Sequence, residues 1–213
     1  SGKKAVIVVT SNRGLAGGYN ASVIKLITGS DLKPDDLLLY TVGNKGKEYF
    51  QHREYTIAKD YSEVIENPMF SDAKEICEEV LGGYAAGEIS EIYLAYTYFK
   101  NTVVHEPKLL KLLPVEIEEA DIEAAKADSL MNYEPEETEA LEIIIPKYVT
   151  SILYGALVEA IASENGARMQ AMDSATSNAQ DMIDHLTLQY NRARQGSITQ
   201  ELTEIIAGAN AIQ

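Results

Sequence analysis

Hydrophobic and polar residues alternate along the first half of the chain in a way that predicts strands and helices in turn. Residues 5–10 and 37–42 are almost continuously apolar, which is typical of strands covered on both faces. Residues 55–58 predict a weaker strand. Residues 91–99 predict another, followed by a hairpin-like return toward Pro114.

Apolar residues at spacings of three and four place helices between these strands. One helix follows Asn20, which we expect to cap it, and ends at Gly29. The next covers residues 45–51, and a third begins at Asp72, a second expected cap. Because strands and helices alternate with short joints, we expect right-handed crossovers and a mostly parallel sheet. The predicted fold of residues 3–115 is therefore a Rossmann-like α/β domain.

From residue 140 to residue 213 the apolar period is helical throughout. Beyond Met169 it tightens into heptads, and a sustained three-and-four spacing with charged flanks indicates one half of a coiled coil. An unbroken helix from about residue 138 would be ~110 Å long. Bends are expected at Pro146, Gly155, Gly166 and Gly196. The predicted coiled-coil seam consists of Met169, Met172, Ile183, Leu186 and Tyr190.

This seam has no partner helix within the chain. Burying one aliphatic side chain contributes roughly 1.5–3 kcal/mol, so leaving the seam in water would forgo on the order of 10 kcal/mol. We therefore expect the seam to be covered by another chain or a missing segment of this one, or to fold back on the α/β domain. An ordinary helical hairpin packed on that domain is the alternative, but the heptads would overshoot a domain ~30–40 Å across.

Charge is concentrated between the two predicted domains. The chain carries 18 basic and 33 acidic residues, a net charge of −15, and residues 116–139 hold ten carboxylates against Lys126. We interpret residues 116–139 as a solvated acidic connector. A metal site formed by these carboxylates is the more specific alternative, but the spacing of an EF-hand is missing. Because an acidic chain repels phosphate backbones, nucleic acid is not an expected partner.

A glycine-rich turn, residues 11–20, follows the first strand at the place where phosphate-binding loops occur. Its spacing is G-x-x-G-G rather than G-x-G-x-x-G, and no Gly-Lys-Ser/Thr follows. We favour a structural turn with positive φ, built on Gly14, Gly17 and Gly18, over a nucleotide site or a partner-binding patch. The scattered histidines and the single cysteine, Cys77, provide no catalytic or metal-binding arrangement.

Three stretches resemble the γ subunit of rotary F-type ATP synthases. The first is SNRGLAGGYN, residues 11–20. The second, residues 163–179, follows the pattern SE..ARM.AM..AT.NA, and the third is YNRARQ at 190–195, continued by ITQELTEIIAGA at 198–209. The resemblance runs in order from Lys3 to Ile212, with departures at Asn12 and Ala16.

The resemblance implies a central-stalk rotor subunit. In this family the C-terminal helix pairs with an N-terminal helix inside a hexamer of α and β subunits, while the globular domain packs on the ε subunit near the c-subunit ring. It also implies a non-catalytic subunit without a cofactor, coupling proton-driven rotation to ATP synthesis or hydrolysis at the cytoplasmic face of the bacterial plasma membrane. The residues then expected to face the hexamer are Arg168, Arg194, Gln195, Thr199, Gln200 and Glu201.

The family's N-terminal helix is missing from this sequence, so we expect the chain to be a fragment whose seam lacks its own partner. Two other hypotheses stay open. One is a nucleotide- or small-molecule-binding α/β enzyme with a helical dimerisation arm, which saturable nucleotide binding would favour. The other is a purely structural coiled-coil adaptor.

Overall fold

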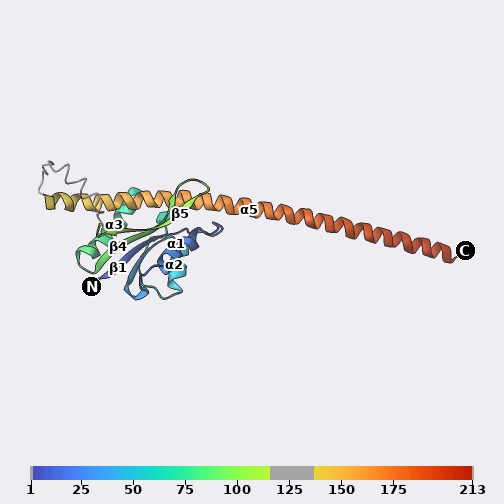
Figure 1. The fold of residues 1–213 in the computed structure, drawn as a ribbon, viewed down its shortest axis with the longest axis horizontal. Coiled ribbons are helices and arrows are strands. Elements are labelled where there is room, and N and C mark those ends of the chain that lie inside the picture. The colour runs from blue at the N-terminus through green and yellow to red at the C-terminus, as the bar shows by residue number, and fades with distance from the viewer. Residues whose placement is uncertain (1, 116–136, 213) are drawn as a thin grey trace. The chain divides into compact units, whose positions relative to one another are not determined.

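The computed structural model describes residues 2–115 and 137–212, and its contacts divide the chain into residues 1–170 and residues 171–213. The first unit is an α/β domain that includes the beginning of a long helix, α5 (Glu137–Ala211), and the second contains the rest of this helix (Figure 1). Most of the predicted acidic connector, residues 116–136, lies outside the described residues.

Five strands form one sheet in the order β3-β2-β1-β4-β5. The central strand β1 (Lys3–Val9) pairs in parallel with β2 (Leu37–Val42) and β4 (Ile89–Phe99), and β2 pairs in parallel with β3 (Ile57–Asp60). The edge strand β5 (His105–Leu113) returns antiparallel to β4. The predicted fold class, a mostly parallel sheet followed by a long C-terminal helix, is confirmed.

Helices cover both faces of this sheet. α1 (Tyr19–Thr28) and α2 (Asn44–Gln51) pack on one face, and α3 (Phe70–Ala85) packs on the other together with the first part of α5 (Figure 1). The β1 residues 5–9 are completely buried between the two helical layers. This burial on both sides is the reason why β1 is an unbroken apolar run in the sequence.

The first part of α5 completes the core of the α/β domain. Val149, Leu153 and Leu157 are at most 1% exposed and belong to the same core cluster as Ile76 and Val80 of α3. Their spacing of four residues places them on one face of the helix. Each such burial contributes about 1.5–3 kcal/mol, so the sheet depends on this helical segment for its second covering layer.

α5 continues without interruption through Pro146 and through the three glycines at which bends are expected. Thr150 Oγ1 donates a hydrogen bond to the Pro146 carbonyl oxygen at 2.7 Å. By length and composition alone, α5 also has the properties of a membrane-crossing helix within Leu141–Ala211. Burial of Val149, Leu153 and Leu157 in the domain core accounts for part of this apolar character.

Two predicted helix caps differ from the structure. Asn20 lies inside α1, and its Oδ1 accepts a hydrogen bond from the Ser11 N–H at 2.9 Å, so it ties the helix to the end of β1 rather than capping it. Asp72 occupies the third position of α3, and its carboxylate accepts a hydrogen bond from the Met69 N–H at 2.8 Å. Asp72 therefore pairs with a backbone N–H that has no partner within the helix, but it does so from inside the helix and not as the capping residue.

The glycine-rich turn uses left-handed backbone at different positions from those predicted. φ is positive at Gly17 (56°) and at Leu15 (63°), but not at Gly14 or Gly18. A Cβ atom at Gly14 would meet nothing within 4 Å. Leu15 thus takes one of the left-handed positions, with its side chain 73% exposed, although such backbone is uncommon for a residue other than glycine.

Replacement of Gly43 by alanine is expected to destabilise the domain strongly. Gly43 has φ of 109° at the end of β2, and a Cβ there would collide with the backbone oxygen of Thr10 at the end of β1. We expect Gly43→Ala to lower the free energy of unfolding by about 2–4 kcal/mol in urea titrations. Gly82→Ala, in α3 where a Cβ meets nothing within 4 Å, is the matched control and should be neutral or stabilising. Equal stability of the two variants would contradict this account of Gly43.

Candidate functional site

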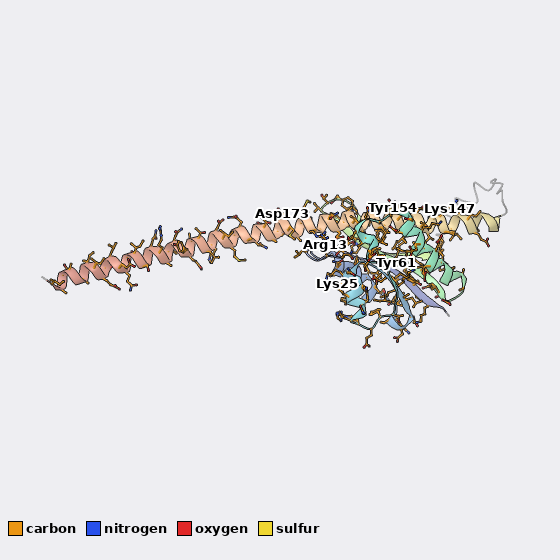
Figure 2. All side chains as sticks on the ribbon, turned by 180° about the vertical axis from the view of Figure 1, so that it is seen from behind. Arg13, Lys25, Tyr61, Lys147, Tyr154 and Asp173 are labelled. Atoms are coloured by element: carbon orange, nitrogen blue, oxygen red, sulfur yellow. The ribbon has the colours of Figure 1, made fainter. Side chains whose placement is uncertain are left out.

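The predicted coiled-coil seam is exposed in the structure. Met169 lies at the end of the first unit and the other four residues lie in the second, and all five side chains are between 40% and 67% exposed. Side chains project from the second part of α5 on all sides (Figure 2). Folding of the seam back on the α/β domain, one of the covers expected from the sequence, stays a prediction. Cover by another chain or segment stays a prediction.

Apolar residues are also exposed on parts of α5 that the heptad pattern does not include. Leu188 lies five positions after Ile183, on a different side of the helix from the seam, and is 51% exposed. Met182 and Ile206 are exposed as well. Sequence reasoning missed these residues because it followed a single apolar stripe of the heptad pattern.

The residues expected to face the hexamer fall into two groups. Arg194, Gln195, Thr199, Gln200 and Glu201 lie close together and exposed on α5. Their hydrogen bonds stay within the helix: Thr199 Oγ1 donates to the Gln195 carbonyl oxygen at 2.9 Å, and Gln200 Nε2 donates to Glu204 Oε1 at 3.0 Å. Arg168 belongs instead to the first unit, where its guanidinium is engaged in local contacts.

Arg168 links α5 to the glycine-rich turn. Its guanidinium donates a hydrogen bond to Glu164 at 2.6 Å, one helical turn earlier, and another at 3.4 Å to the carbonyl oxygen of Gly14. Both side chains of the ion pair are less than one-third exposed. The sequence pattern contains both partners of the ion pair, but only the fold brings Gly14 to Arg168, 154 residues away in the chain.

The β4–β5 hairpin contacts α5 along the same stretch. Ser163 Oγ donates a hydrogen bond to the Thr97 carbonyl oxygen at 3.3 Å, and Gln170 Nε2 donates to the Val103 carbonyl oxygen at 3.4 Å. Between them, Gly166 lies against His105: a Cβ at Gly166 would be 2.5 Å from His105 Nε2. Gly166, expected to be a bend, is thus a site of close approach.

Several buried polar atoms around this contact have no hydrogen-bond partner among the described residues. They are Tyr19 Oη, Thr97 Oγ1, His105 Nε2 and Glu159 Oε2. Desolvation raises the pKa of Tyr19 above its ordinary value and also raises the pKa of Glu159, although the charge of Lys108 opposes the second shift. Buried polar atoms without partners cost stability, so these groups are not what holds α5 on the hairpin.

The carboxyl ends of β1, β2 and β3 surround a polar hollow of about 570 Å³, where doubly wound folds bind their ligands. The groups around it bond mainly to one another. Asn12 Nδ2 donates to the Ser62 carbonyl oxygen at 2.9 Å, and Asn12 Oδ1 accepts from the Asn44 N–H at 2.9 Å. Asp60 accepts hydrogen bonds from Lys47 Nζ at 2.7 Å and Thr41 Oγ1 at 3.0 Å. The polar groups at these strand ends therefore brace the loops.

Asp60 and Cys77 have shifted pKa values for different reasons. Burial opposes ionisation of Asp60, but hydrogen bonds from Lys47, Ser62 and Thr41 outweigh it and hold the pKa below its ordinary value. Burial raises the pKa of Cys77 to about 11, so its thiol stays protonated at neutral pH and is a poor nucleophile. Within the described ranges, no group of three or more His, Cys, Asp or Glu residues is arranged to hold a metal ion.

Comparison with known proteins assigns the chain to a family. The family model described as ATP synthase matches residues 1–212. The ATP synthase gamma chain of Lachnoclostridium phytofermentans is 63% identical over 218 residues, which cover all of this chain and 75% of the relative. The chain belongs to the ATP synthase gamma chain family. The sodium ion specific gamma chain of Acetobacterium woodii is 43% identical, over 99% of this chain and 75% of its own length.

Solved structures agree with this assignment. A central stalk and c-ring structure of the Tetrahymena thermophila mitochondrial ATP synthase matches with a TM-score of 0.62 and 26% identity, covering 83% of this chain and 78% of the other. A chain of the Euglena gracilis mitochondrial ATP synthase has the same fold, with a TM-score of 0.73 at 18% identity, over 99% of this chain and 73% of the other. The chain is therefore a rotor-stalk subunit of a membrane-associated ATP synthase, and nothing in these comparisons supports the enzyme alternative.

Asp60 is expected to stabilise the fold in a pH-dependent way. Because its pKa is lower in the folded state than in the unfolded chain, its contribution is present above the unfolded pKa and is lost as pH falls through the folded pKa. We expect Asp60→Asn to lower the free energy of unfolding by about 1–3 kcal/mol at pH 7, measured in urea, and the difference to shrink toward pH 3. Asp35→Asn, an exposed position before β2, is the control. A difference independent of pH would contradict a role for the Asp60 charge.

Proposed function

We propose that the second part of α5 turns inside a hexamer of α and β subunits and couples rotation of a membrane ring to ATP synthesis or hydrolysis there. In this proposal the chain itself is non-catalytic, and its α/β domain contacts the ε subunit and the c-subunit ring. The complex lies at the cytoplasmic face of the bacterial plasma membrane. The observation that carries the proposal is the long exposed helix, apolar on more than one side, in a chain that matches gamma chains along its whole length.

The distribution of exposed apolar residues supports a helix with several neighbours. One partner helix along the seam would cover Ile183, Leu186 and Tyr190, but Leu188 lies on another side. Apolar surface of this extent on an isolated helix forgoes burial energy at several positions. A partner helix would cover the seam, and the subunits of a surrounding hexamer would cover the apolar residues on the other side.

The polar cluster near the C-terminal end suits a contact that must break during each turn. Thr199 and Gln200 direct hydrogen bonds to their own helix, so part of their hydrogen-bonding capacity is already used. A partner surface then gains little by binding them and loses little when the helix moves on. Arg194 and Glu201 add exposed charges, which give weak, screened attractions.

We propose protons as the coupling ion. The Acetobacterium woodii relative is named sodium ion specific, whereas the more similar Lachnoclostridium phytofermentans relative carries no such specification. ATP hydrolysis by the membrane-bound complex should then be unaffected when sodium is withdrawn. Strict dependence on sodium would overturn this part of the proposal.

Photo-crosslinking tests the position of the helix in the hexamer. We expect p-benzoylphenylalanine in place of Gln195, in the full-length gamma chain of the assembled complex, to form crosslinks to α or β subunits on irradiation, since Gln195 is exposed and belongs to the residues proposed to face the hexamer. The same replacement at Gln51, exposed at the end of α2 in the α/β domain, is the control and should give no such product. Crosslinks from position 51 but not from position 195 would contradict the proposal, because they would show that the α/β domain and not the second part of α5 contacts the hexamer.

A further inference from the structure

We propose that residues 163–170 of α5, held by the glycine-rich turn and the β4–β5 hairpin, form the joint through which torque passes between the α/β domain and the rotating helix. We call these residues and the two loops the grip. The inference rests on the proposed function, because it concerns how a rotor carries load. It assigns Arg168 and Gly166 as positioning residues inside the subunit.

The grip holds the helix on two sides. Ser163, Gly166 and Gln170 are spaced by three and four residues, so they share one side of α5, and this side meets the β4–β5 hairpin. Glu164 and Arg168, four residues apart, share another side, because Glu164 is turned by about 100° around the helix axis from Ser163 and Arg168 by about 200° from Gly166. That side meets the glycine-rich turn through the Gly14 carbonyl oxygen. Rotation of the helix about its own axis is thus opposed in both directions.

On the hairpin side of the grip, a side chain of β5 packs closely against Gly166, where α5 has no side chain. The missing side chain leaves a notch in α5, and His105 of β5 fills it, with Nε2 2.5 Å from the position of an added Cβ. The Thr102 carbonyl oxygen lies 3.1 Å from the same position. Gly155, eleven residues earlier in the same helix, has nothing within 4 Å of its added Cβ. The notch is therefore local to the grip and is not a general feature of the glycines in α5.

The position of the grip also fits a mechanical joint. Earlier in α5, Leu153 and Leu157 are anchored in the domain core. After Gln170 the helix belongs to a separate unit and is exposed. The grip therefore lies at the end of the first unit, between the segment of α5 that is anchored in the domain core and the exposed segment that would carry the load.

The proposal predicts a loss of coupling under load with intact turnover without load. Gly166→Ala and Arg168→Gln are each introduced into the full-length gamma chain of an assembled ATP synthase. Hydrolysis by the detached catalytic hexamer with its gamma chain should stay within about two-fold of the parent, because an unloaded helix needs no joint. ATP-driven ion pumping by the membrane-bound complex should fall by about five-fold or more, the factor that a weakening of about 1 kcal/mol produces.

Matched variants separate a positioning role from a general structural one. Gly155→Ala, in the same helix, should leave both activities unchanged. His105→Ala combined with Gly166→Ala removes the side chain that the new methyl group meets and should restore part of the pumping. Arg168→Lys keeps the charge beside Glu164 and should retain more pumping than Arg168→Gln.

Each outcome decides the inference. Equal loss of activity in the detached hexamer would overturn it, because Arg168 or Gly166 would then act on the hexamer itself. Unchanged pumping in both Gly166→Ala and Arg168→Gln would also overturn it, and if one variant fails to fold, the other decides. Crosslinking from position 195 is measured in the same complexes. If the complex without either substitution gives no such crosslinks, the proposed function is refuted. If the crosslinks form in all complexes and pumping is unchanged by both substitutions, only the grip is refuted.

Discussion

Burial of the first part of α5 against the sheet is the interaction on which the rest of this structure depends. Leu153 and Leu157 have no exposed surface, and together with α3 they form the second covering layer of the sheet. A parallel sheet needs helices on both faces, and without α5 the apolar residues of β1 and β4 on that side would lie partly open. The same helix therefore completes the domain and carries the exposed segment that defines the subunit.

The two parts of α5 differ in whether their apolar residues are buried or exposed. Up to residue 170 its apolar residues are buried where they meet the sheet, and polar contacts such as Arg168 with Glu164 and Gly14 surround them. Beyond residue 170 the apolar residues are exposed on several sides, as in a surface made for partners. One uninterrupted helix thus joins a segment packed in the domain core to an exposed segment.

The ligand-binding position of a doubly wound fold is put to another use in this chain. Asn12, Asp60 and Lys47 lie at the strand ends where such folds bind nucleotides, but they bond to neighbouring loops and brace the carboxyl edge of the sheet. The glycine-rich turn contributes the Gly14 carbonyl oxygen to Arg168. Polar chemistry that resembles a binding loop in sequence is thus used to hold the domain together and to hold α5.

The sequence by itself determined the strand and helix pattern, the long C-terminal helix and the family, because apolar periods and the stretch near Arg194 are local properties of the chain. It did not determine that Asn20 binds Ser11, that Leu15 rather than Gly14 takes a positive φ, or that Gly166 receives His105. Each of these depends on which distant segments the fold brings together. A glycine in a helical pattern predicts a weak point, and only the tertiary structure decides whether another backbone or side chain fills the space that it leaves.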